Sequence, residues 1–225
     1  MNRIFIIALV LMACCGQISA GEQLSLVNKD YIKNYLTKEA AWADSHDAVG
    51  DYLGAAMLYY SLCYVQKAKL CVCLGSGGGF VPRVMRQAQR DLGLTDARTI
   101  LVDGNIGNWG TPCWLDPDSF FKKQFPDIEV IVDTTHNVAL NQAQQWQINY
   151  LHIDADHSLE GALQDFIDYA PYMASNGIIT FHDTEGWLPC SKILAIVESL
   201  GYKVINFNTL GAGLAIIYLG SSTKF

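Results

Sequence analysis

The chain has 225 residues, of which 51% are hydrophobic and 16% charged, and its formal net charge is -7. A chain of this size and apolar content can bury a full core, which excludes an intrinsically disordered protein. The acidic balance argues against nucleic acid as a partner, because phosphate binding needs clustered basic residues. Arg83, Arg86 and Arg90 follow a helical spacing, and we interpret them as a solvated helix face. A small molecule is the expected ligand.

The first twenty residues have the pattern of an export signal. Arg3 supplies a positive start, residues 4–15 form an apolar run too short to span a bilayer, and Ala20 offers a cleavage site. The four residues ending at Cys14 also resemble a bacterial lipoprotein box. We expect residues 1–20 to be a signal peptide or membrane anchor, and the protein to be exported or tethered to a membrane. An active domain would then lie on the cytosolic face.

Residues 21–68 are predicted to form a helical segment, with helices over 26–43 and 49–68. The five cysteines after Ala20 show no disulfide framework, and Cys71 and Cys73 are expected to share one buried face of a strand. Residues 69–225 alternate apolar runs with amphipathic stretches and form one domain. Strands are expected at 70–74, 99–102, 129–132, 148–153, 177–181, 203–207 and 214–219. Helices are expected at 80–92, 119–125, 138–146, 159–173 and 191–200.

This alternation predicts an α/β fold with a Rossmann-like, doubly wound sheet of seven strands, mostly parallel, with an antiparallel last strand. The connection at 208–213 is too short for a crossover, so the last two strands should pair antiparallel. Open parallel sheets bind ligands beyond the carboxyl ends of their strands. The residues that follow each strand are therefore the candidate site.

A glycine-rich loop follows the first predicted strand. Gly75, Gly77 and Gly79 precede a helix, and Asp103 closes the second strand at a distance suited to binding a ribose diol. This arrangement indicates a cofactor of the nucleoside type. A dinucleotide fingerprint would need a further glycine near Phe80, so a nicotinamide-dependent oxidoreductase is disfavoured.

A second cluster is expected where the fourth and fifth strands end. Asp154 closes the fourth strand, and His182 with Asp183 closes the fifth. A divalent cation would keep such converging groups from repelling one another. Asp156 or His157 could act as a general base. Structural roles stay open as well: Asp156 as a helix cap, His157 as a hydrogen bonder, and Asp154 and Asp183 as cap and turn residues.

Four motifs carry a family resemblance from about residue 70 to 219. They are residues 73–79 (Cys-Leu-Gly-Ser-Gly-Gly-Gly), 101–104 (Leu-Val-Asp-Gly), 152–158 (His-Ile-Asp-Ala-Asp-His-Ser) and 176–183 (Asn-Gly-Ile-Ile-Thr-Phe-His-Asp). With them the chain resembles the class I S-adenosylmethionine-dependent methyltransferases, and in particular a small-molecule O-methyltransferase branch.

The resemblance implies a role for each motif. Gly75, Gly77 and Gly79 would line the methionine and ribose of S-adenosylmethionine, Asp103 would bind the ribose hydroxyls, and Asp133 and Thr134 would lie near the adenine. Asp154, His182 and Asp183 would hold a divalent cation such as Mg²⁺, with His182 in place of an acid. Cys73 also departs from the family, which has an acidic residue there.

The expected function is methyl transfer from S-adenosylmethionine to a hydroxyl of a small acceptor, assisted by a metal ion. One alternative is an exported or tethered protein that keeps the fold without catalysis. The nicotinamide-dependent oxidoreductase is a more remote alternative.

Overall fold

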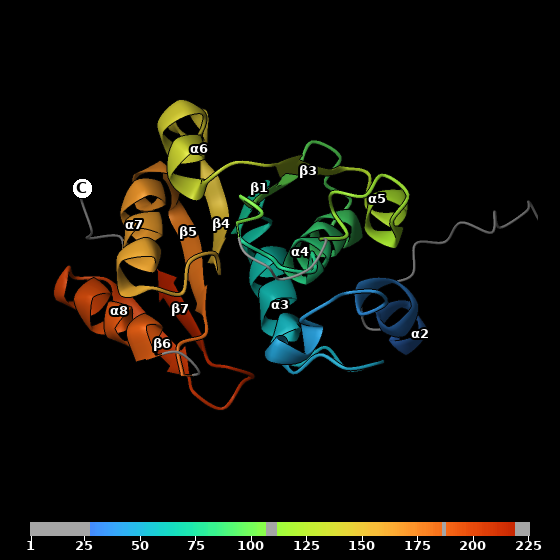
Figure 1. Cartoon of the computed structure of the whole chain (residues 1–225), viewed down its shortest axis with the longest axis horizontal. Helices are drawn as coiled ribbons and strands as arrows, with labels where there is room; N and C mark the ends of the chain where they lie inside the picture. Colours follow the sequence, from blue (N-terminus) through green and yellow to red (C-terminus); the bar gives the residue numbers. More distant parts are fainter. Residues whose placement is uncertain (1–27, 107–111, 186–187, 219–225) are drawn as a thin grey trace, which may run out of the picture.

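The computed structural model describes residues 28–106, 112–185 and 188–218. Within them, seven strands form one sheet in the order β3-β2-β1-β4-β5-β7-β6 (Figure 1). The strands are β1 Leu70–Leu74, β2 Arg98–Val102, β3 Ile128–Ile131, β4 Ile148–Ile153, β5 Met173–His182, β6 Lys203–Phe207 and β7 Leu214–Tyr218. β7 runs antiparallel to both of its neighbours, and β1 to β5 are parallel. The predicted fold class is confirmed.

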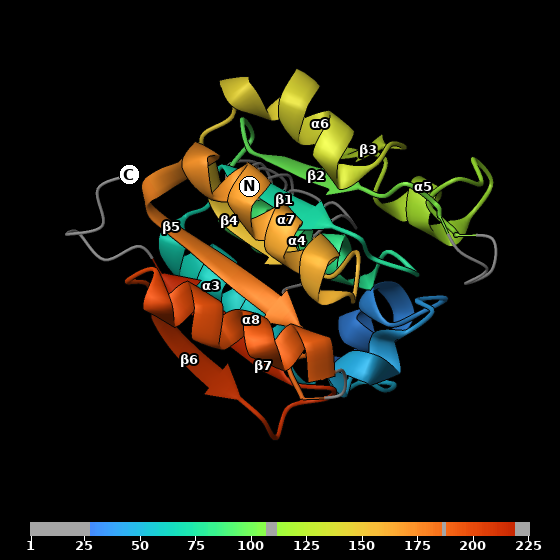
Figure 2. The same ribbon diagram turned by 60° about the vertical axis from the view of Figure 1, so that its left-hand side comes forward.

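Helices cover both faces of this sheet (Figure 2). On one face lie α3 and α4, and on the other lie α6, α7 and α8. The helices are α2 Lys29–Tyr31, α3 Ala56–Gln66, α4 Phe80–Asp91, α5 Phe120–Gln124, α6 Thr135–Asn141, α7 Leu159–Tyr169 and α8 Leu188–Ser199. Shorter helical turns are η1 Ile32–Leu36, η2 Ala43–His46, η3 Ala143–Gln145 and η4 Ala170–Tyr172.

Strand β1 divides the core into two layers, because successive side chains point to opposite faces of the sheet. Cys71 and Cys73 pack with α3 and α4, whereas Val72 and Leu74 pack with the helices of the other face. All four side chains are fully buried. The two cysteines therefore share a buried face, as predicted.

The N-terminal segment agrees with the predicted helices only in part: α3 lies within the helix predicted over 49–68, whereas the helix predicted over 26–43 ends early, after α2 and η1. After η1 the chain turns, and it turns again at Trp42, Asp47, Gly50 and Gly54, which all have positive φ. A Cβ at Gly54 would lie 2.3 Å from the carbonyl oxygen of His46, so the chain folds back on itself there. These turns end the helical pattern and bring residues 42–47 to the sheet.

The predicted solvated face of α4 is wrong. Arg83 is fully buried and Arg86 nearly so. The Arg83 guanidinium donates to the carbonyl oxygens of Lys38 (2.7 Å) and Glu39 (3.2 Å), because the N-terminal segment covers this side of the helix. Helical spacing alone does not distinguish a solvated arginine from one that satisfies buried carbonyl groups.

The predicted signal or anchor at residues 1–20 lies outside the described residues and stays a prediction. In the described part of the chain, no helix has both the length and the apolarity that a membrane span requires.

Candidate active site

The glycine loop lies between β1 and α4 and needs glycine for two reasons. Gly75, Gly77 and Gly79 have φ values of +69°, +49° and +74°, which side chains other than glycine rarely adopt. A Cβ at Gly75 would also lie 2.3 Å from the carbonyl oxygen of Asp154. The loop therefore packs directly on the end of β4 and connects the two parts of the predicted site.

Asp103 closes β2 beside this loop. Its Oδ2 accepts a hydrogen bond from the Ser76 amide (3.2 Å), and its Oδ1 accepts one from the Asn105 amide (2.8 Å). Burial raises the pKa of Asp103, although both amide hydrogen bonds favour the anion. A carboxylate fixed in this way can still accept hydrogen bonds from a diol, since each oxygen has a second lone pair.

Cys73 replaces the acidic residue expected at the start of the loop. Its Sγ donates to the carbonyl oxygen of Gly75 over 3.1 Å. Burial raises the pKa of the thiol well above its usual range, so the group is neutral. Cys73 thus supports the turn without supplying a negative charge.

Asp133 and Thr134 follow β3 and begin α6. Thr134 is the N-cap and accepts a hydrogen bond from the Asn137 amide (3.2 Å). The Asp133 Oδ1 accepts from the Thr134 amide and from the Asn137 side chain. These contacts explain the local structure, and the predicted position near an adenine stays a prediction.

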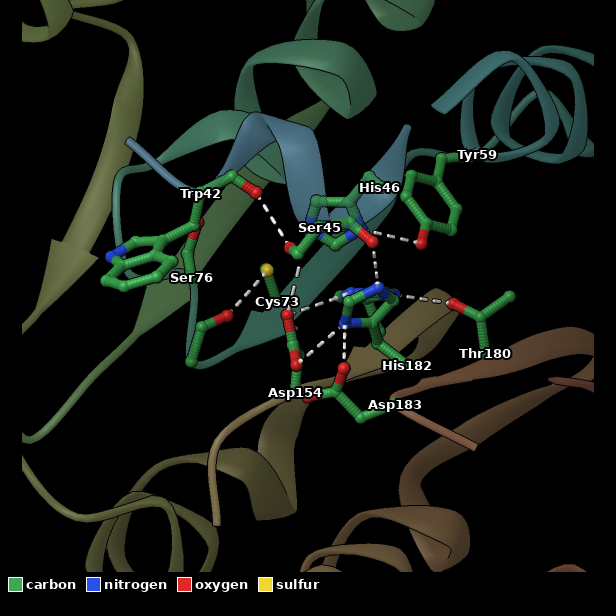
Figure 3. Close-up of polar contacts among 12 residues, drawn as sticks. Trp42, Ser45, His46, Tyr59, Cys73, Ser76, Asp154, Thr180, His182 and Asp183 are labelled. Carbon is green, nitrogen blue, oxygen red and sulfur yellow. Dashed lines mark hydrogen bonds and ion pairs between the residues drawn. The ribbon is translucent and has the colours of Figure 1, made fainter. Parts of the chain in front are cut away.

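Four of the five histidines of the chain face Asp154. Figure 3 shows His46 and His182 beside this carboxylate. The Asp154 Oδ2 lies 4.0 Å from His46 Nε2 and 3.8 Å from His152 Nε2. The Asp154 Oδ1 lies 3.4 Å from His157 Nε2 and 3.3 Å from His182 Nδ1.

Asp183 adds a second carboxylate to the cluster. Its backbone has a φ of +58°, a strained value for a residue other than glycine, directly after β5. Its Oδ1 lies 3.2 Å from His182 Nδ1, and its Oδ2 lies 3.1 Å from His157 Nε2. The expected convergence of Asp154, His182 and Asp183 is therefore present in the fold.

The charges of the cluster are tightly coupled. Burial alone would raise the pKa of Asp154, but the His182 charge and the hydrogen bonds from His157 and His182 hold it well below its usual range. Burial opposes the charge on His182, yet Asp154 raises its pKa to about 9. Burial lowers the pKa of His46 well below its usual range and also lowers that of His152. Without a bound ion, the cluster holds an Asp154–His182 ion pair beside the neutral imidazoles of His46 and His152.

His46 is a member of the cluster that no sequence motif identified. It lies in η2 of the N-terminal segment, between Trp42 and Asp47, whose positive φ values turn the chain sharply. The Ser45 carbonyl accepts a hydrogen bond from His182 Nε2 (3.2 Å), which attaches this turn to β5. His46 lies outside the four sequence motifs, so local sequence gave no indication of its role.

Asp156 has a different environment from the other predicted site residues. Its Oδ1 accepts a hydrogen bond from the Ser158 amide (2.8 Å), and its carboxylate packs against Gly161 in the first turn of α7. Ser158 is the N-cap of that helix. These are the contacts of a capping residue, whereas His157 turns into the cluster.

Among the described residues, two groups of side chains could hold a metal ion. They are His46, Asp154 and His182, and Asp154, His157 and Asp183, and within each group the potential ligand atoms lie within 4.8 Å of one another. The buried His152 Nε2 has no hydrogen-bond partner among the described residues, although it points at Asp154. An unpaired buried nitrogen beside this donor set fits a bound cation.

The sequence matches the family model described as a methyltransferase domain over residues 72–184. The chain belongs to this family, so its predicted place among the class I S-adenosylmethionine-dependent methyltransferases is confirmed. The match begins within β1 and ends two residues after β5, so it includes the glycine loop and every member of the cluster except His46. No protein of curated function matches the sequence.

Solved structures of other methyltransferases share the fold. The O-methyltransferase TomG from Streptomyces achromogenes, in complex with SAM, is 10% identical, with 94% of this chain and 96% of that chain covered and a TM-score of 0.61. The O-methyltransferase from Bacillus cereus, in complex with SAH, is 11% identical, with coverages of 95% and 97% and a TM-score of 0.61. The SAH-bound methyltransferase of Podospora anserina is 14% identical, with both coverages 98% and a TM-score of 0.59.

Proposed function

We propose that the protein transfers the methyl group of S-adenosylmethionine to a hydroxyl of a small molecule, with a divalent cation assisting. The observation that carries the proposal is the direct packing of the glycine loop on Asp154, seen in the contact that a Cβ at Gly75 would make. Because β1 pairs with both β2 and β4, Asp103 and Asp154 lie on either side of that loop. Bound SAM and SAH in fold neighbours add support.

The residues for the methyl donor come from β1 and β2. The glycine loop lets a ligand approach the backbone closely, and the N–H groups at the start of α4 can donate hydrogen bonds to S-adenosylmethionine. Asp103 offers acceptor lone pairs to the two ribose hydroxyls. S-adenosylmethionine supplies a methyl group on a positively charged sulfur.

The acceptor hydroxyl must lose its proton as the methyl group is transferred. His157 is the candidate base, since its Nε2 lies between Asp154 and Asp183 and its ring is the most exposed imidazole facing Asp154. Asp154 raises the pKa of His157 through a hydrogen bond, which strengthens it as a proton acceptor. A cation at Asp154, His182 and Asp183 would lower the pKa of a hydroxyl bound to it.

Calorimetry with the full-length chain tests the donor. We expect S-adenosylmethionine to bind and NADH not to bind. Failure to bind S-adenosylmethionine at millimolar concentration would refute the proposal and favour an inactive protein with this fold, whereas tight NADH binding would favour an oxidoreductase.

A single variant tests the division of the site. In an assay of S-adenosylhomocysteine release with a panel of catechol, phenol and sugar acceptors, Asp154→Ala should lower methyl transfer by at least about 100-fold. Binding of S-adenosylmethionine should change little, because Asp103 and the glycine loop remain. Equal loss of binding and transfer would contradict the role given to Asp154.

A further inference from the structure

We infer that the cluster around Asp154 binds a transition-metal ion such as Zn²⁺ or Co²⁺ in preference to Mg²⁺, and that His46 is one of the ligands. This inference rests on the divalent-cation part of the proposed function, and it changes both the ligand set and the class of metal. It adds a residue from the N-terminal segment, outside the motifs that carry the family resemblance.

The donor set is rich in nitrogen. His46 Nε2, His182 Nδ1 and a carboxylate oxygen of Asp154 form one of the two groups whose ligand atoms lie within 4.8 Å of one another. Two imidazoles and one carboxylate are a common set for catalytic transition-metal ions, and they leave coordination positions open for a substrate oxygen. Mg²⁺ prefers oxygen ligands and keeps several of its waters.

Hydrogen bonds hold both imidazoles in a ligating orientation. His182 Nε2 donates to the Ser45 carbonyl (3.2 Å), which leaves Nδ1 facing Asp154. His46 Nδ1 is hydrogen-bonded to the Tyr59 hydroxyl (3.1 Å), which leaves Nε2 facing Asp154. Ligating histidines in metal sites are held in this way, with the second ring nitrogen bonded to a carbonyl or another polar group.

His152 is an independent sign that a ligand belongs in this space. Its ring is fully buried in β4, and its Nδ1 is hydrogen-bonded to the Thr180 hydroxyl (2.8 Å). Its Nε2 has no hydrogen-bond partner among the described residues and lies 3.8 Å from Asp154 Oδ2. Leaving a buried imidazole nitrogen unpaired is costly, and a cation or its bound water would remove that cost.

The two carboxylate oxygens of Asp154 face different histidines. Asp154 Oδ2 faces the buried rings of His46 and His152. Asp154 Oδ1 faces His182 and His157, nearer to Asp183. Among the described residues, the ion pairs of Oδ2 are with imidazole nitrogens, and nitrogen donors select transition metals.

Titration of the metal-free, full-length chain with Co²⁺ tests the inference through the visible absorption of the bound ion, without any activity. We expect one Co²⁺ to bind with the absorption of a nitrogen-ligated site, Zn²⁺ to displace it, and a millimolar excess of Mg²⁺ to leave it bound. Displacement by Mg²⁺, or no Co²⁺ binding, would overturn the inference.

Matched histidine variants test the ligand assignment. His46→Ala should weaken Co²⁺ binding by well over tenfold, whereas His136→Ala should not alter it, because His136 pairs with Asp168 outside the cluster. Equal affinities of the two variants would overturn the role of His46. Should His46→Ala not fold, Tyr59→Phe keeps the buried ring and should weaken binding about tenfold by removing the hydrogen bond to His46. Unchanged affinity in that variant would also count against the inference.

Binding of S-adenosylmethionine to the same samples separates this inference from the proposed function. A chain that binds the methyl donor but prefers Mg²⁺ would refute the transition-metal assignment alone. A chain that binds Co²⁺ as described but not the methyl donor would refute the proposed function alone.

Discussion

The neighbouring side chains determine the ionisation of Asp154. Most buried carboxylates have a raised pKa, but the imidazoles around Asp154 keep it ionised. Its neighbour in sequence, His157, shares the cluster, whereas Asp156 points to the helix that follows. Within residues 154–157, Asp154 and His157 therefore belong to the cluster, and Asp156 caps the following helix.

This division predicts opposite outcomes for two conservative variants. His157→Gln should lower kcat for methyl transfer by about 100-fold or more, since a general base contributes a factor of this size. Asp156→Asn should leave kcat nearly unchanged and alter stability by about 1 kcal/mol or less. Steady-state kinetics and thermal unfolding measure the two effects. A large loss of kcat in Asp156→Asn would restore the alternative base.

Asp165, which lies outside the candidate site, should make the stability of the fold depend on pH. It is buried in α7, its Oδ2 has no hydrogen-bond partner among the described residues, and burial raises its pKa from 3.8 to about 7. The folded chain then holds a proton that the unfolded chain releases between these two values. The contribution of Asp165 to stability is therefore greatest at low pH and declines as pH rises to about 7.

Asp165→Asn should remove this decline in stability with rising pH. We expect the free energy of unfolding to rise by about 1 to 2 kcal/mol at about pH 8, and to change little at about pH 4, where the folded carboxyl is protonated and the unfolded one is only about half ionised. Urea denaturation at the two pH values measures the difference. Glu160→Gln, an exposed position on the same helix, is the control, and an equal effect there would contradict the assignment.

At the scale of the elements, the site depends on how closely the ends of β1 and β4 approach. The loop after β1 leaves no room for a side chain at Gly75, because the carbonyl of Asp154 occupies the space. The η2 turn approaches the same strand ends from the N-terminal segment, where Ser45 and His46 contact His182 and Asp154. Three separate parts of the chain thus set the position of one carboxylate.

Gly75→Ala and Gly93→Ala form a matched pair for this contact. Both positions have positive φ, so each variant should lose about 1 to 2 kcal/mol of stability from backbone strain. A Cβ at Gly93 meets nothing within 4 Å, whereas one at Gly75 displaces the backbone at Asp154. Only Gly75→Ala should therefore weaken binding of S-adenosylmethionine and of a metal ion. Calorimetry with each ligand measures this, and equal binding by the two variants would contradict it.

At the scale of the whole molecule, the N-terminal segment and the sheet share one core. Tyr31, Leu36 and Tyr59 pack in the same buried cluster as Cys71 and Cys73 of β1. The segment is therefore part of the domain that holds the site, and His46 is positioned by the packing of the whole face. A ligand at Asp154 would stabilise this packing as well as the strand ends.

Shared burial predicts a single cooperative unfolding transition. Leu36→Ala, at a fully buried position, should lower the free energy of unfolding by about 2 to 5 kcal/mol and shift the transition of the entire sheet. Circular dichroism and tryptophan fluorescence should report coincident midpoints. Leu200→Ala, at an exposed position, is the control. Two separated transitions in Leu36→Ala would show that the segment unfolds on its own.

The sequence alone predicted most of the sheet and every member of the cluster except His46 and His152. Apolar runs located β1 and β4 at their observed ends, since strands buried on both faces are largely apolar, and the ends of β6 were also correct although that strand is largely exposed. The short connection before β7 required antiparallel pairing. Asp154, His182 and Asp183 were predictable together, because parallel strand ends meet at one edge of a sheet.

Tertiary structure decided what local pattern cannot encode. The helical spacing of α4 predicted exposed arginines, but the N-terminal segment covers Arg83 and supplies the carbonyl oxygens that it binds. The same segment carries His46 to Asp154, although 108 positions of sequence separate the two. Such contacts depend on chain reversals at positive φ and on packing across a whole face. Local sequence patterns are thus sufficient to predict the methyltransferase fold, whereas the full set of residues in its histidine cluster depends on the packing of distant segments.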